Sequence, residues 1–181
     1  MMSVRSTVLT TLLASLVAAS ASAQGALPIP SVPAARDVAD AKMLPNPKTE
    51  YKVLFDAGRE TPKPGDVNPI LQATARYLNT LAKYGVPAAN RKLAVVFHQG
   101  ATDYIMHNDA YKARHGHDNP NVAIIQDLKK AGVEFHVCGQ AVLGRKIERN
   151  QIMPEIQVDL WALTTIIELE TAGYIRIGGG G

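Results

Sequence analysis

The segment NPNVAIIQDLKKAGVEFHVC, residues 119–138, decides the fold class because it holds a helix and a strand in direct succession. Its first part opens with turn-forming residues and then repeats apolar side chains at helical spacing, at Val122, Ile125 and Leu128. Gly132 ends that pattern, and the apolar run at 133–138 has the composition of a strand. The segment therefore predicts half of a β–α–β unit.

The same alternation continues on both sides of this segment. Before it come a strand candidate at 51–57 (YKVLFDA), an amphipathic helix over 67–84 and the buried-strand pattern LAVVFH at 93–98. After it come a helix over 158–172 and a closing strand at 174–177. Strands that alternate with helices predict a mostly parallel sheet with helices on both faces, that is, a three-layer α/β sandwich.

The N-terminus has the pattern of a cleavable signal peptide over residues 1–23. Arg5 precedes an uncharged apolar run, and Ala21-Ser22-Ala23 gives the small residues that precede a cleavage site. Removal of residues 1–23 from the 181 leaves a mature chain of 158 residues, the size of one domain. We therefore expect a periplasmic or secreted protein that has no membrane segment after cleavage.

Three further segments complete the predicted organisation of the chain. Residues 24–50 form a proline-rich lead-in, within which a short helix over 34–44 is expected. Residues 51–177 form the α/β domain, and residues 178–181 form a flexible glycine tail.

Charge and motifs exclude several classes of function. The chain has 19 basic and 16 acidic residues, a balance that does not indicate nucleic-acid binding. It contains no G-x-S-x-G, no P-loop and no G-x-G-x-x-G, so α/β-hydrolase, nucleotide and dinucleotide chemistry have no support. No cofactor is predicted.

Polar residues at the ends of three predicted strands are the candidate site. Asp56, His98 and Cys138 each fall at the carboxyl end of a strand, where sites form in open α/β sheets. His136 lies two residues before the only cysteine and therefore on the same face of its strand. Gly139 lets the backbone come close to the sulfur, and a short helix beginning there would stabilise a thiolate. The alternative is an inert thiol buried at the end of an apolar strand.

The histidines raise a third alternative, a metal site. His98, His136 and Cys138 could supply ligands, and His115-Gly116-His117 lies in a polar loop. None of these residues has the spacing of a zinc finger or of a zinc-protease helix, so no residue is assigned as a metal ligand.

Three stretches of the chain resemble the DsrE/DsrF-like family, in its exported branch. They are LAVVFHQGA, NPNVAIIQDLKKAGVEFHVCGQAV and MPEIQVDLWALTTIIELETAGYIRI, within residues 51–177. The resemblance implies a compact α/β sandwich that assembles as a homo-oligomer, a trimer or a hexamer. Cys138 matches the cysteine that carries a persulfide in the sulfur-relay members.

The resemblance leads to two hypotheses about function. In the first, the chain is an exported sulfur-handling protein, a sulfurtransferase-type carrier that exchanges sulfur with a donor or acceptor protein. Cys138 is then the nucleophile, His136 or His98 assists it, and the ligand-binding residues are Asp56, Gly139 and Gln140. In the second, the chain is a non-enzymatic oligomeric binding module for a small ligand or a protein partner, and Cys138 is structural.

Overall fold

The computed structural model describes residues 26–61, 63 and 65–178, so the predicted signal peptide lies outside the described residues. Five strands form one sheet in the order β4-β3-β2-β1-β5, and every neighbouring pair is parallel. The strands are β1 Tyr51–Ala57, β2 Arg91–Phe97, β3 Glu134–Cys138, β4 Gln157–Asp159 and β5 Ile175–Gly178.

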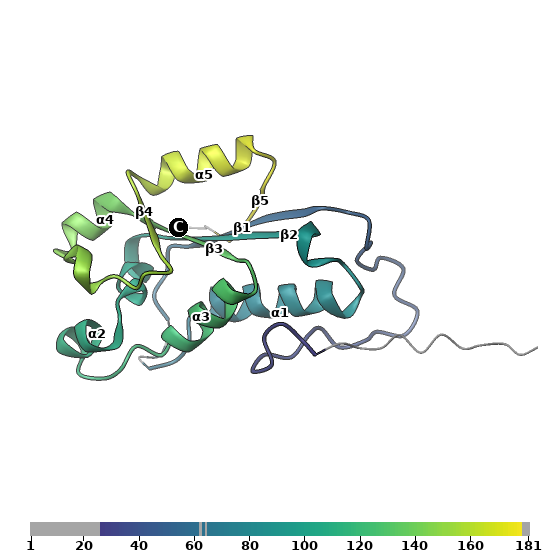
Figure 1. Cartoon of the computed structure of the whole chain (residues 1–181), viewed down its shortest axis with the longest axis horizontal. Helices are drawn as coiled ribbons and strands as arrows, with labels where there is room; N and C mark the ends of the chain where they lie inside the picture. Colours follow the sequence, from purple (N-terminus) through teal and green to yellow (C-terminus); the bar gives the residue numbers. More distant parts are fainter. Residues whose placement is uncertain (1–25, 62, 64, 179–181) are drawn as a thin grey trace, which may run out of the picture.

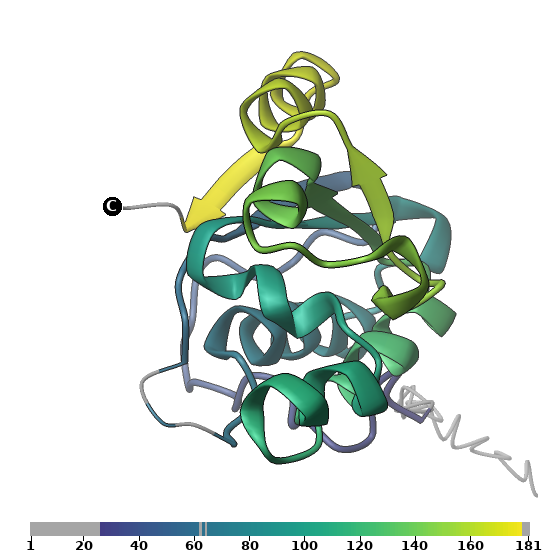
Figure 2. The same cartoon turned by 90° about the vertical axis from the view of Figure 1, so that its left-hand side faces the viewer.

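Helices cover both faces of this sheet, which confirms the predicted three-layer sandwich. Helices α1 and α3 lie on one side, α5 lies on the other, and α2 and α4 lie at the carboxyl ends of the strands (Figure 1). Figure 2 shows the same layers from that end. The α-helices are α1 Pro69–Lys83, α2 Asn108–His115, α3 Val122–Lys130, α4 Gly139–Gly144 and α5 Ala162–Thr171. The 3₁₀ turns are η1 Ala88–Asn90, η2 Gln99–Ile105 and η3 Arg149–Gln151.

Strand order explains why α5 is alone on its face. The chain steps from β1 to β4 in one direction across the sheet, and then returns through α5 to place β5 beside β1. Right-handed crossovers put a connection that runs in the reverse direction on the opposite face. The hydrophobic core is accordingly unequal. The α1 and α3 side holds a large cluster, whereas the hydrophobic cluster on the α5 side has six buried residues: Leu54, Ala94, Val96, Cys138, Ala162 and Ile166.

Helix α1 shows how the sequence sets the ends of an element. The Asn68 side chain accepts a hydrogen bond from the backbone N–H of Ile70 (2.8 Å), and Pro69 occupies the first turn. Gly85, with a φ of +76°, ends the helix in a conformation that favours glycine. Among the described residues no helix is long and apolar enough to span a bilayer.

The lead-in is packed against α1, and the short helix expected at 34–44 is absent. Ile29 is fully buried, and Asn79 bonds the backbone of Ile29 through both its N–H (2.9 Å) and its carbonyl (2.8 Å). The Ala35 N–H donates to the Thr80 hydroxyl (2.9 Å). The helix prediction was wrong because these backbone groups bind α1 instead of one another.

The helix predicted over 158–172 also begins later than expected. Residues Gln157–Asp159 form β4, which pairs with β3 in the register Val137↔Val158, and α5 starts at Ala162. Three residues are too few for their strand pattern to show in the sequence, so pairing with β3 decides their conformation.

Candidate functional site

The carboxyl ends of the strands bring three predicted residues to one edge and one face of the sheet. The β1–β2 register aligns Asp56 with Val96, and the β2–β3 register aligns Phe97 with Val137. The next residues, His98 and Cys138, therefore follow at the same level on neighbouring strands. Alternation along a strand puts these side chains on the α5 face. The sequence correctly predicted this shared edge.

Asp56 is the centre of a buried ion cluster. Its side chain is inaccessible to solvent, and one carboxylate oxygen bonds Nε2 of His98. The other oxygen accepts from Nε of Arg176 (2.8 Å) and from a second nitrogen of the same guanidinium. Burial raises the pKa of Asp56, but the hydrogen bonds from His98 and Arg176 outweigh burial and hold the pKa below its ordinary value. Both oxygens thus have partners within the protein, and the side chain is closed to solvent.

Cys138 lies at the end of β3 with 4% of its surface exposed. Its neighbours on the α5 face are apolar, including Ala162 and Ile166 of α5. No hydrogen bond joins the thiol to any residue that the structure describes, so neither His98 nor His136 contacts it as a hydrogen-bond partner. The thiol is placed at the predicted edge, and α5 covers it.

Helix α4 begins directly after the thiol, as the sequence predicted. A Cβ at position 139 would lie 2.5 Å from the backbone oxygen of Asp159, closer than any side chain tolerates. Gly139 is therefore required by the close approach of β3 to the end of β4. The Gln140 side chain donates to the carbonyl of Leu160 (3.2 Å), which ties α4 to the β4–α5 connection.

His136 is held by a carboxylate that the sequence did not indicate. Its Nδ1 lies 2.8 Å from Asp159, which also accepts from the hydroxyl of Thr165 (2.9 Å) and from the side chain of Gln157 (2.7 Å). The other ring nitrogen, Nε2, is buried, has no hydrogen-bond partner among the residues that the structure describes, and lies 3.9 Å from Glu134. Asp159 thus fixes the orientation of the His136 ring through Nδ1.

Two residues of this site were not predicted from the sequence. Arg176 is the charged residue within the apolar run YIRI, and a lone arginine at the centre of a strand is a signal of a buried partner. Asp159 gave no signal, because it was assigned to a helix, and only the β3–β4 pairing brings it opposite Cys138.

The structure does not assemble the histidines into a metal site. Within the described ranges, no group of three or more His, Cys, Asp or Glu residues is arranged to hold a metal ion. His98 and His136 each bind a carboxylate instead, and His115 binds Asp103 at 2.9 Å.

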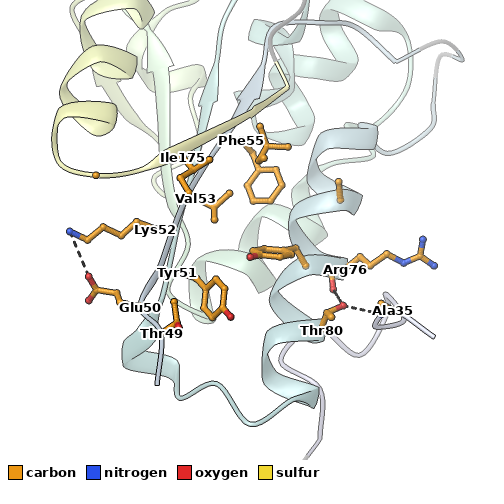
Figure 3. A pocket seen from close by; sticks show the side chains of 14 residues that line it. Ala35, Thr49, Glu50, Tyr51, Lys52, Val53, Phe55, Arg76, Thr80 and Ile175 are labelled. Atoms are coloured by element: carbon orange, nitrogen blue, oxygen red, sulfur yellow. Dashed lines mark hydrogen bonds and ion pairs between the residues drawn. The ribbon is translucent and has the colours of Figure 1, made fainter. Parts of the chain in front are cut away.

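A large apolar hollow lies on the opposite face of the sheet from Cys138. It has a volume of about 770 Å³ and lies between α1 and the β1–β5 edge (Figure 3). Val53, Phe55 and Ile175 face this space from the sheet, and Arg76 is among the residues of α1 that line it. None of the predicted site residues lines this hollow.

Comparison with known proteins places the fold. The model of the DsrE/DsrF-like family matches residues 61–177. A protein of unknown function from Methanobacterium thermoautotrophicum, MTH1491, has a similar solved structure with a TM-score of 0.50 and 15% sequence identity. That similarity covers 70% of this chain and 97% of the other. No curated protein matches. The family match spans more than half of the chain, and the chain therefore belongs to the DsrE/DsrF-like family.

Proposed function

We propose that this chain is an exported sulfur carrier in which Cys138 accepts sulfane sulfur and holds it as a persulfide. The family is generally related to sulfur relay, and Cys138 is the only thiol of the chain. The single observation that carries the proposal is the place of this thiol, at the carboxyl edge of a parallel sheet and directly before α4. Sites in open α/β sheets form at that edge.

In the proposed reaction α5 moves aside to admit the sulfur donor, and the start of α4 stabilises the sulfur anion. The first-turn N–H groups of α4 have no intrahelical partner, and they lie next to the thiol in the chain. Such donors favour the thiolate over the thiol. His98, fixed by Asp56 on the neighbouring strand, is our candidate for removing the thiol proton or positioning the donor, and His136 is the second candidate.

The chemistry is a displacement at sulfur. The Cys138 thiolate attacks the outer sulfur of thiosulfate, a bond forms between the two sulfurs, and sulfite leaves with the electron pair of the broken S–S bond. With a polysulfide donor the leaving group is a polysulfide one sulfur atom shorter. The product is the Cys138 persulfide, and no external oxidant or reductant is needed.

Intact-mass spectrometry tests this proposal. The mature protein and its Cys138→Ser variant are incubated with polysulfide or thiosulfate, and then measured with and without a reductant. A gain of one sulfur atom that a reductant removes, on the unsubstituted protein alone, is expected. A Cys138→Ser protein that accepts sulfur equally well would refute the role of this residue.

A second function is favoured by the burial of the thiol. A cysteine that is 4% exposed, among apolar side chains and without a hydrogen bond, also suits a binding module in which Cys138 is structural. Alkylation of the native protein separates the two proposals. A thiol that reacts under native conditions supports sulfur carriage, and one that reacts only after unfolding supports the binding module.

Self-association forms part of the proposal. The start and outer face of α5 expose four large apolar side chains, with 75% of Leu160, 49% of Trp161, 47% of Leu163 and 51% of Ile167 accessible. An apolar surface of this kind is typical of a protein–protein interface. We expect a homo-oligomer in light-scattering measurements, and a monomer for Leu163→Glu combined with Ile167→Glu. If this double variant remains an oligomer, the interface lies on another surface.

Export is proposed from residues 1–23 alone. N-terminal sequencing of the protein recovered outside the cytoplasm should begin at Gln24. A protein that retains Met1 in the cytoplasmic fraction would contradict a cleaved signal peptide.

A further inference from the structure

A small polar cavity lies apart from Cys138, at the same end of the sheet. It has a volume of about 160 Å³ and lies between the β1–α1 connection, η2, α2 and the end of α4. Eight of the side chains that line it are polar or aromatic: Glu60, Thr61, Asp103, Tyr104, Tyr111, His115, His117 and Arg145. Cys138 lies at the start of helix α4 and Arg145 directly follows its end, so the backbone rises about 10 Å along the helix between these two residues.

Asp103 anchors the charged part of the cavity. It is 5% exposed, and its carboxylate binds Nε2 of His115 at 2.9 Å and a guanidinium nitrogen of Arg145 at 3.0 Å. A nitrogen of Arg114 lies 3.5 Å from the same carboxylate. Asp103 is therefore fully partnered, and it fixes the positions of His115 and Arg145 at the cavity.

Aromatic rings form another part of the wall. The Tyr111 ring lies 4.2 Å from the ring of His115 and 6.4 Å from that of Tyr104, between ring centres, and His117 lies 5.6 Å away at an edge. Tyr111 is 5% exposed, and its hydroxyl makes no hydrogen bond to any residue that the structure describes. The Tyr104 hydroxyl, by contrast, is bonded by Thr61 (2.8 Å). The Tyr111 hydroxyl is thus a nearly buried donor left open at the cavity.

The charges around the cavity balance in pairs. Two guanidinium groups, of Arg114 and Arg145, face two carboxylates, of Asp103 and Glu60. Arg145 and Glu60 do not form a hydrogen-bonded ion pair, because their nearest N–O distance is 3.9 Å and the Glu60 side chain is 69% exposed. A full anion or a full cation gains no net attraction from such a set, whereas a ligand that carries both charges is complementary to it.

We propose that this cavity binds a small free α-amino acid. The ligand carboxylate accepts from Arg145 and from the Tyr111 hydroxyl, and the ligand ammonium donates to Glu60 and packs against the aromatic rings. The volume limits the ligand to a small side chain, such as that of alanine or serine. Neither Cys138 nor its chemistry is part of this site, so the proposal is independent of sulfur carriage.

Isothermal titration calorimetry with L-alanine and L-serine tests the proposal on the mature protein. Binding is expected for both, and Tyr111→Phe should weaken it roughly tenfold, because the variant loses one hydrogen bond to a charged group. Arg149→Met, which removes an exposed arginine of η3 outside the cavity, should bind like the unsubstituted protein. The absence of binding, equal binding of acetate or methylammonium, or a Tyr111→Phe protein of unchanged affinity would each overturn the proposal.

Nuclear magnetic resonance of the unsubstituted protein locates the site without any variant. Addition of L-alanine should shift the ring signals of His115 and His117 and leave that of His107 in place, because His107 bonds the carbonyl of Asn150 outside the cavity. A ligand that binds without shifting His115 or His117 would place its site elsewhere and overturn the assignment.

Discussion

Replacement of Arg176 by methionine isolates the energetic role of the Asp56 cluster. The substitution keeps an unbranched side chain on β5 and removes the guanidinium that binds one oxygen of Asp56. The Asp56 side chain is fully buried, so its negative charge then retains only His98 as a partner. A buried carboxylate that loses a partner cannot recover the lost interaction from water.

The expected cost follows from the burial of the two partners. Breaking a buried ion pair costs about 3–5 kcal/mol. Two features reduce this value here, because the Arg176 side chain is 34% exposed and His98 still bonds Asp56. We therefore expect a loss of about 2–3 kcal/mol in the free energy of unfolding at neutral pH. For a chain of this size that loss lowers Tm by about 5–10 °C.

The dependence on pH distinguishes a charge effect from a packing effect. In the unsubstituted protein the pKa of Asp56 lies below 3.8 because the hydrogen bonds outweigh burial. A depressed pKa contributes stability that is present above pH 3.8 and is lost as the pH falls through the folded-state pKa. In Arg176→Met the pKa of Asp56 should rise, so the deficit should be largest at neutral pH and should shrink under acid conditions that protonate Asp56.

Urea unfolding of both proteins at neutral and at acid pH measures these differences. Arg149→Met serves as the control, because it removes an exposed arginine that the Asp56 cluster does not contain. A loss of less than about 1 kcal/mol at neutral pH, within the range of surface pairs, would refute the argument from burial. A deficit that stays constant under acid conditions would show that packing, and not charge, is lost.

Three further predictions follow from single contacts. Gly139→Ala should destabilise the fold by about 1–3 kcal/mol in urea unfolding, because the new Cβ would lie 2.5 Å from the backbone oxygen of Asp159. An unchanged free energy of unfolding would show that the end of β4 can shift without cost. Asn79→Ala should accelerate hydrogen exchange of the Ile29 amide and leave β1 unchanged, since Asn79 bonds Ile29 and Val32; unchanged exchange would show that other contacts hold the lead-in. Burial, together with nearby Tyr104, Asp103 and Glu60, raises the pKa of Tyr111 to about 12. The contribution of the neutral Tyr111 side chain to the stability of the fold is therefore complete below pH 10 and is lost as the pH rises toward about 12. In an ultraviolet titration of the folded protein, the tyrosine that ionises at the highest pH should be missing from the curve of Tyr111→Phe. An unaltered titration curve would contradict the assignment.

The sequence predicted strands β1, β2 and β3 and helices α1 and α3 because their signals are local. The apolar runs of β1, β2 and β3 and the helical period of α1 decide those elements without help from distant residues. Two errors arose where distant contacts decide the conformation. Residues 157–159 become a strand because β3 offers a partner, and residues 34–44 form no helix because the N–H of Ala35 binds Thr80 of α1.

For the candidate site, too, the sequence predicted what depends on local signals and missed what depends on contacts between distant residues. Asp56, His98 and Cys138 could be predicted together because parallel strands bring their carboxyl ends to one edge. Their partners could not, since Arg176 binds Asp56 from 120 positions along the chain and Asp159, which binds His136, lies in a strand that was not predicted. The burial of Cys138 depends on α5, whose position over β1, β2 and β3 follows from the reversal of direction in the sheet.

Cyanolysis of the sulfur-loaded protein is the most direct test of sulfur carriage by Cys138. Cyanide removes the outer sulfur of a persulfide, releases thiocyanate and returns the thiolate, so thiocyanate counts the transferable sulfur. After loading with polysulfide and removal of the excess, the mature protein should release one thiocyanate per chain and regain an alkylatable Cys138, while Cys138→Ser should release none. No thiocyanate from the unsubstituted protein, or equal amounts from both proteins, would contradict sulfur carriage by Cys138.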